Sequence, residues 1–165
     1  MKTRSLISIL AVATISMATA LVFAQQKPAT MDSSEQAIRN AVLETNHKMA
    51  KAANSLNVDD FFSYILDTDK GSIVQNGTVF KSRQEAREAV KQGFMGVETL
   101  ERRFVNPQVT VISPEVALLT SEGTVSAKLT DGRTMEGRFA VSLIFVRKDG
   151  EWKLLHGHYS APVRM

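Results

Sequence analysis

The sequence predicts an α+β domain in which three N-terminal helices cover one face of a long mixed or antiparallel sheet. Apolar residues recur at helical spacing in the first half of the chain, whereas the second half consists of long β-type segments between turn signals. The 165 residues are 44% hydrophobic and 22% charged, a composition typical of one globular domain. A strongly curved sheet over helices encloses a cone, and we expect a pocket at its open end.

Residues 1–24 have the pattern of a secretory signal peptide. Lys2 and Arg4 supply a positive start, an uncharged stretch follows, and Val22 and Ala24 are small residues before a polar segment. A membrane anchor is the alternative, because an uncharged stretch of this length can just span a bilayer. Hydroxyl residues dilute the apolar stretch, so we expect cleavage after Ala24. The mature protein would then be exported, periplasmic or secreted, without a membrane segment.

Charge and cysteine content exclude several function classes. Cleavage removes two of the 20 basic residues and none of the 17 acidic ones, so the net charge falls from +3 to +1. No basic stripe with interleaved aromatic residues is present, so nucleic acid is not an expected partner. The absence of cysteine excludes disulfides, thiolate metal sites and a cysteine nucleophile.

One domain is expected over residues 32–165, after a short polar lead-in at residues 25–31. Its first helix is predicted to begin at Ser33, because Ser33 and Gln36 have the spacing of a capping box. The residues that follow place one apolar face at helical period: Ile38, Ala41, Val42, Thr45, Met49, Ala52, Ala53 and Leu56.

Two shorter helices are predicted next. Asn57 can cap a helix whose first turn carries Asp59 and Asp60, where the helix dipole favours acidic side chains. Ser82 and Glu85 form a second capping box, which opens a helix that ends near its glycines.

The rest of the chain is predicted to be strands. The Asn76-Gly77, Asp131-Gly132 and Asp149-Gly150 pairs favour tight hairpin turns, and Ser113-Pro114 marks a fourth turn. Several strands exceed the usual length of about 3–10 residues, so bulges and strong curvature are expected. The predicted strands are Ser72–Gln75, Thr78–Phe80, Thr99–Ile112, Val116–Thr130, Thr134–Lys148 and Glu151–Ala161.

Two segments resemble a known superfamily. The ending DGEWKLLHGHYS and the middle segment ILDTDKGSIVQNGTVFKSRQEAREAV are similar to the nuclear transport factor 2-like superfamily, especially its SnoaL-like and calcium/calmodulin-dependent kinase association-domain branches. The resemblance covers about Ser33 to Ser160 and implies a cone-shaped α+β fold. That superfamily includes isomerases, dehydratases, hydrolases, cyclases, transport adaptors and oligomerisation modules, so the fold does not select a function. Association domains have arginine where this chain has Tyr159, so their anion-binding role is not carried over.

His156 and His158 are the first candidate site residues. They lie two apart on the last predicted strand, so alternation predicts that they share a face with Trp152, Leu154 and Ser160. We expect the two histidines near the pocket mouth for acid–base chemistry, to which the ordinary pKa of histidine, near 6.5, is suited, and Ser160 beside them as a ligand-binding residue. A zinc site needs at least a third ligand, and no other histidine or acidic residue lies at a spacing from this pair that is typical of metal ligands. We therefore predict no metal and no cofactor.

Three further residues are candidates, each with a structural alternative. Asp67 is a possible general base beside the pocket mouth, although Asp-Thr-Asp-Lys-Gly is also good turn chemistry. Tyr64 is a possible ligand-binding hydroxyl or a core tyrosine. Glu122 is a possible ligand contact or one half of a cross-strand pair with Arg138.

Three functions remain open from the sequence. We expect an exported pocket protein that binds a small, mostly apolar molecule. The alternatives are a cofactor-independent isomerase, dehydratase or cyclase that uses His158 or His156 with Asp67, and an oligomerisation module acting through the sheet face. The strand through Phe139, Val141, Leu143 and Phe145 is apolar on both faces, which favours a homodimer through the sheet. These four residues are candidates for either the core or the dimer interface.

Overall fold

The computed structural model describes residues 33–68 and 71–162. The predicted signal peptide, residues 1–24, and the lead-in, residues 25–31, lie outside them. The chain divides into two units, residues 1–30 and 31–165, and the second contains every helix and strand named below. None of the described helices is long and apolar enough to cross a membrane.

Three helices form where the capping signals predict them. They are α1 (Ser33–Asn54), α2 (Val58–Ser63) and α3 (Arg83–Phe94). The side chain of Asn57 accepts a hydrogen bond from the Asp60 N–H at 3.0 Å, which confirms the cap of α2.

The cap of α3 differs from a capping box in one detail. Ser82 accepts a hydrogen bond from the Glu85 N–H at 3.1 Å, as predicted. The Glu85 carboxylate accepts from the Lys81 N–H at 2.8 Å, one residue before the cap. Arg83 then joins α3 to α2, because its guanidinium donates to the carbonyl of Phe62 at 2.7 Å.

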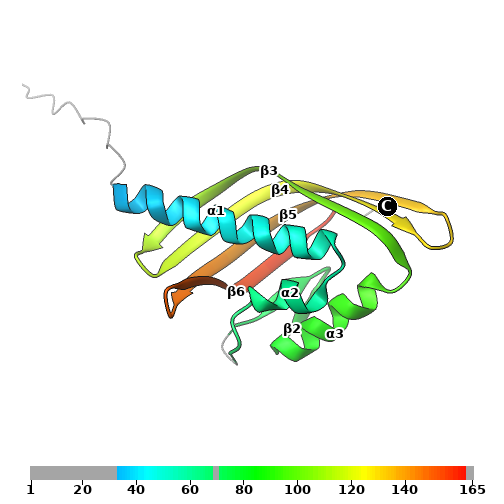
Figure 1. The fold of residues 1–165 in the computed structure, drawn as a ribbon, viewed down its shortest axis with the longest axis horizontal. Coiled ribbons are helices and arrows are strands. Elements are labelled where there is room, and N and C mark those ends of the chain that lie inside the picture. Colours follow the sequence, from blue (N-terminus) through cyan, green and yellow to red (C-terminus); the bar gives the residue numbers. More distant parts are fainter. Residues whose placement is uncertain (1–32, 69–70, 163–165) are drawn as a thin grey trace, which may run out of the picture. The chain divides into compact units, whose positions relative to one another are not determined.

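The strands form one open mixed sheet with the order β2-β1-β6-β5-β4-β3. Neighbouring strands are antiparallel except β1 and β6, which are parallel. The α+β class with helices and a mixed sheet is therefore confirmed, as Figure 1 shows. The strands are β1 (Ile73–Gln75), β2 (Thr78–Phe80), β3 (Val97–Ser113), β4 (Val116–Leu129), β5 (Thr134–Lys148) and β6 (Glu151–Ser160).

The predicted irregularities occur in the edge strand and in the last strand. The pairing of β3 with β4 shifts between Val105 and Gln108, where Asn106 has a φ of 49° and Pro107 follows. An edge strand tolerates proline because one side of its backbone has no ladder partner. The pairing of β5 with β6 shifts between Ile144 and Phe145.

The core lies between α1 and one face of the sheet, which we call the helix side (Figure 1). Val42 and Met49 of α1 are buried there. The four apolar residues of β5 that were candidates for core or interface are all core: Phe139, Val141, Leu143 and Phe145. We call the opposite face the open side, and on β5 it carries Ala140 and Ser142, both exposed.

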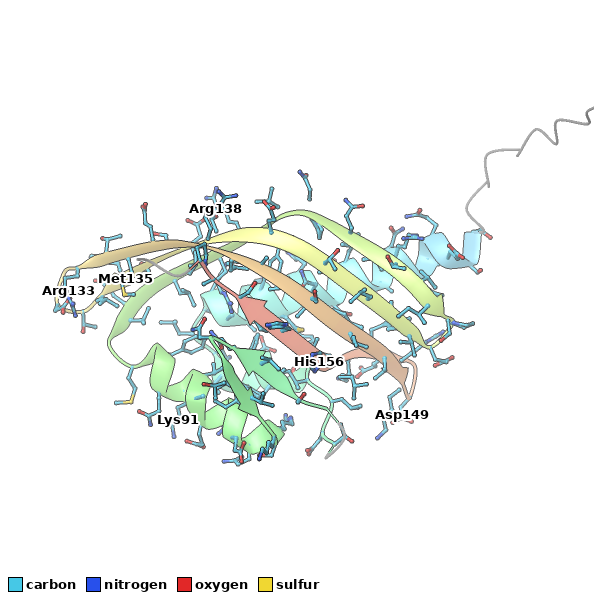
Figure 2. The ribbon with its side chains drawn as sticks, turned by 180° about the vertical axis from the view of Figure 1, so that it is seen from behind. Lys91, Arg133, Met135, Arg138, Asp149 and His156 are labelled. Carbon is cyan, nitrogen blue, oxygen red and sulfur yellow. The ribbon has the colours of Figure 1, made fainter. Side chains whose placement is uncertain are left out.

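β3, β4 and β5 continue beyond the end of β6. The last residue of β6, Ser160, pairs with Ala140, so residues 134–139 of β5 have no strand partner on that side among the described residues. These residues, with 123–128 of β4 and 99–104 of β3, form a three-stranded part that we call the extension. The turn between β4 and β5 lies at its end, beside Arg133 and Met135 in Figure 2.

Candidate functional site

The bulge in β6 changes the face on which the two histidines lie. Leu154 pairs with Phe145 and His156 with Ile144, so Leu155 is an extra residue between adjacent pairs. A bulge of one residue moves every following side chain to the other face. The predicted face shared by Trp152, Leu154 and the histidines is therefore wrong. Trp152 and Leu154 are buried on the helix side, whereas His156 lies on the open side (Figure 2).

Gly157 and Tyr159 take the helix-side positions instead. A Cβ at Gly157 would meet the side chains of Ile73 and Leu143, and Tyr159 is 9% exposed within the core. His158 and Ser160, one residue away from each, are exposed on the open side.

His156 is half-buried and has a polar neighbour from another segment. Its Nδ1 lies 3.0 Å from the hydroxyl of Ser72, just before β1. The Ser72 carbonyl also accepts a hydrogen bond from the Gly157 N–H at 3.2 Å. Both contacts join the segment before β1 to β6, which gives His156 a structural role at this place.

The other open-side candidates follow the register of the sheet. Glu122 pairs with Ala140, and Ala140 pairs with Ser160, so these residues form one cross-strand row. Glu122 also lies 3.5 Å from Arg138, and both side chains are about three-quarters exposed, at 73% and 75%. This is the predicted cross-strand pair on a solvated face.

Tyr64 and Asp67 lie at the end of α2 and beyond it. Tyr64 is half-buried, and its carbonyl accepts a hydrogen bond from the Leu154 N–H at 2.8 Å. Asp67 is exposed. The structure thus brings His158, Ser160 and Glu122 to one face, and Tyr64 packs against the core of the other. Across residues 33–68 and 71–162, no three side chains of metal-ligating type gather.

A different set of residues meets on the helix side of the extension. Phe139 and Phe104 pack edge to face, with ring centroids 5.4 Å apart. Alternation continues this face outward in cross-strand rows whose members are half-buried, except Met135, which is 61% exposed. We call these residues the distal apolar face: Leu100, Phe104, Val125, Ala127 and Met135.

Gly123 lets the Phe139 ring lie close to the backbone of the extension. A Cβ at Gly123 would collide with the ring of Phe139 and with the carbonyl oxygen of Arg103. Only glycine permits so close an approach of ring and backbone. The position of Phe139 beside the distal apolar face therefore depends on the residue opposite it in β4.

Arg102 is the one charged residue in these helix-side rows. Its guanidinium carbon lies 5.4 Å from the ring centroids of both Phe139 and Tyr159. The Asn54 side chain holds the backbone of Arg102 in place, accepting from its N–H at 2.8 Å and donating to its carbonyl at 3.3 Å. Burial raises the pKa of the Tyr159 hydroxyl, and the nearby Arg102 charge opposes that rise.

The open side of the extension is chemically different. A shallow hollow there has a volume of about 610 Å³ and a lining that includes the charged and hydroxyl side chains of Glu101, Arg103, Thr124 and Arg138. Arg103 forms an ion pair with Glu101 at 2.5 Å, and both side chains are more than half exposed. Paired, solvated charges of this kind satisfy one another.

Arg102 was not predicted as a site residue from the sequence. The signal that could have revealed it is the alternation Leu100, Arg102, Phe104, which places a charge between two apolar residues on one face. Tyr159 was also missed, because regular alternation along the strand would place it on the open side, whereas the bulge at Leu155 places it on the helix side.

Comparisons with known proteins agree with this architecture. The SnoaL-like domain model matches residues 42–164 of the chain. The comparison with curated proteins found no match.

Several solved structures are similar. A nuclear transport factor 2-like superfamily protein from Salmonella enterica serovar Typhimurium gives a TM-score of 0.72 at 12% identity, covering 79% of this chain and 95% of that one. A putative dehydratase from Streptomyces avermitilis gives 0.71 at 18% identity, covering 79% and 99%. A putative scytalone dehydratase from Novosphingobium aromaticivorans gives 0.69 at 10% identity, covering 79% and 87%. At these identities the similarity is one of fold.

Proposed function

Because the chain belongs to the SnoaL-like domain family, a fold that carries many activities, we propose a function from its own side chains. We propose that it binds a small, mostly apolar molecule in a pocket on the helix side, at the distal apolar face. The observation that carries this proposal is the incomplete burial of that face. Met135 is 61% exposed and Phe104 half-buried, next to a core whose residues are almost fully buried.

Partial burial of this kind is expected of a binding surface. An apolar side chain gains about 25 cal/mol for each Å² removed from water, so a folded chain covers such residues where it can. Contiguous exposed apolar surface rimmed by polar groups marks interaction sites on soluble proteins. A small molecule lying on these residues would supply the missing burial.

An enzymatic role through His156 or His158 with Asp67 has less support. The polar contact of His156 is with Ser72, His158 is exposed, and Asp67 is exposed in the segment after α2. A general acid or base gains its shifted pKa from burial or from charged neighbours. The binding function is therefore the one that the geometry supports best.

A matched pair of substitutions tests the proposed pocket. Ala127 and Ser126 are adjacent in β4 and point to opposite sides of the sheet. Ala127→Trp would fill the distal apolar face and should abolish binding of the neutral fluorescent probe phenylnaphthylamine. Ser126→Trp places the same bulk on the open side and should leave probe affinity within about twofold. Equal loss in both variants, or no probe binding to the wild type, would contradict the proposal.

We also propose a homodimer through the open side and export after cleavage at Ala24. The open side of β5 carries Ala140 and Ser142, small residues that suit packing against a second sheet. A native mass spectrum of protein purified from its host reports subunit number and bound ligand together, and a mature monomer would contradict the dimer. N-terminal sequencing decides export, because an intact Met1 would contradict cleavage.

A further inference from the structure

Arg102 differs from the other arginines that the structure describes. Most of them place the guanidinium beside an acceptor within the protein. Arg39, Arg87, Arg103, Arg133 and Arg138 have carboxylate partners, and Arg83 donates to main-chain carbonyls. Arg147 is exposed to solvent. Among the described residues, Arg102 alone is half-buried with no acceptor for its side-chain donors.

The side-chain donors of Arg102 are not fully buried, because among the described residues the only fully buried side-chain donor without a partner is Nε of Arg39. They therefore meet solvent and are accessible to a ligand. Arginine carries five N–H donors in a rigid fork whose geometry matches a carboxylate. The faces of Phe139 and Tyr159 stabilise the charge but accept none of these hydrogen bonds in the plane of the fork. The donors of Arg102 are therefore available to a ligand that carries an anionic group.

The position of Arg102 is fixed before any ligand arrives. Asn54 at the end of α1 pairs with both backbone polar groups of Arg102, on the edge of β3 that none of the described strands covers. The rings of Phe139 and Tyr159, which belong to β5 and β6, then contact the guanidinium. A donor fixed in this way loses little entropy on binding, which favours affinity.

We propose that the pocket on the helix side selects a small organic anion, in which an apolar body lies on the distal apolar face and a carboxylate-like group binds Arg102. This inference rests on the proposed function and adds the chemical class of its ligand. The Tyr159 hydroxyl stays protonated at neutral pH, because burial raises its pKa, and so it carries no competing negative charge beside Arg102.

The test uses two probes that share an apolar body and differ in charge. Anilinonaphthalene sulfonate is an anion, and phenylnaphthylamine is its neutral counterpart. We expect the wild-type chain to bind both, and the anion more tightly. Arg102→Gln should weaken anion binding roughly ten- to a hundredfold, the value of a charge-assisted hydrogen-bonded contact. Affinity for the neutral probe should stay within about twofold.

The adjacent residue supplies the control. Arg103 lies on the same strand and carries the same charge, but it points to the open side. Arg103→Gln should leave both affinities unchanged. A larger loss of anion binding in Arg103→Gln than in Arg102→Gln would overturn the inference and place the anion in the open-side hollow.

The remaining outcomes separate the two proposals. If both probes bind equally well and Arg102→Gln changes neither, the apolar pocket stands and the anion selection is wrong. If neither probe binds the wild type, the proposed function is wrong and the inference falls with it. If Arg102→Gln does not fold, Arg102→Lys keeps the charge over the rings, and its anion affinity should exceed its neutral affinity. If the two probes bind with equal affinity, both to Arg102→Lys and to the wild type, the inference is overturned.

Discussion

Arg102 and Arg103 are neighbours in the chain, yet they lie on opposite sides of the sheet and their charges have different surroundings. On the open side Arg103 pairs with Glu101, in water and beside other charged residues. On the helix side Arg102 rests on two aromatic rings, with no acceptor among the described residues. Exposed ion pairs contribute about 0–1 kcal/mol and are screened by salt, so the open-side charges describe a solvated surface.

The difference shows which side has unused binding capacity. The open side satisfies its polar groups internally, through Arg138 with Glu122 and His156 with Ser72. On the helix side of the extension, Met135 remains exposed to water, and the guanidinium of Arg102 has no acceptor among the described residues. A ligand gains binding free energy where the free protein has not already made its contacts.

The largest expected effect concerns the glycine behind Phe139. Gly123→Ala should lower the free energy of unfolding by about 1–3 kcal/mol, because the added Cβ collides with the Phe139 ring and with a backbone carbonyl. It should also weaken probe binding on the helix side, since Phe139 can no longer lie against β4. Denaturant unfolding and probe titration measure the two effects on one preparation.

The neighbouring strand offers a matched control for this substitution. At Gly137 on β5 an added Cβ would meet the Val125 side chain at 3.4 Å, which is ordinary van der Waals contact. Gly137→Ala should therefore stay within about 0.5 kcal/mol of the wild type. Equal losses at both glycines would show that the extension resists any added side chain and that Phe139 has no special position.

The second prediction uses the titration of Tyr159. Burial raises its pKa, so between the ordinary value near 10 and the raised value the folded chain keeps a proton that the unfolded chain has lost. The contribution of Tyr159 to stability is thus fully present below about pH 10 and is lost as pH rises through the raised pKa. Each unit of pKa difference corresponds to about 1.4 kcal/mol.

Tyr159→Phe removes this titration. The stability difference between wild type and variant should be constant below about pH 10 and should shift in favour of the variant above it, in urea unfolding at each pH. A stability difference that stays constant throughout the alkaline range would show that the Tyr159 hydroxyl is solvated in the folded protein. Water would then reach the helix side beside the aromatic rings.

The elements of the fold were predictable because they depend on local signals. Asn57 and Ser82 cap their helices as predicted, and the strands lie between the predicted turns. The first helix ends at Asn54, earlier than its apolar period suggests, since Leu56 has a φ of 55°. These signals act within one or two turns of the chain, so a sequence carries them directly.

The site was less predictable because it depends on register. The extra residue Leu155 moves His156 and His158 to the open side and Tyr159 to the core, and its local signal is a weak one, the isolated glycine Gly157 two residues later in the strand. Whether Arg102 meets an acceptor depends on α1 and β5, far away in the sequence. Periodicity predicts the face of a residue only while the pairing is regular.

The smallest expected effect is the one that discriminates best between the two sides. The sequence pattern alone placed His158 at the pocket mouth, where His158→Phe would abolish ligand binding. The structure places His158 exposed on the open side, paired across β5 with Ser142. We therefore expect His158→Phe to change the free energy of unfolding of the monomer by less than about 0.5 kcal/mol, the usual range for surface substitutions. Affinity for both probes should also stay within about twofold, because the changed side chain points away from Arg102 and the distal apolar face.

A thermal melt and a probe titration on the same variant measure both quantities. Loss of probe binding with an unchanged melting temperature would restore the histidine site and move the pocket to the open side.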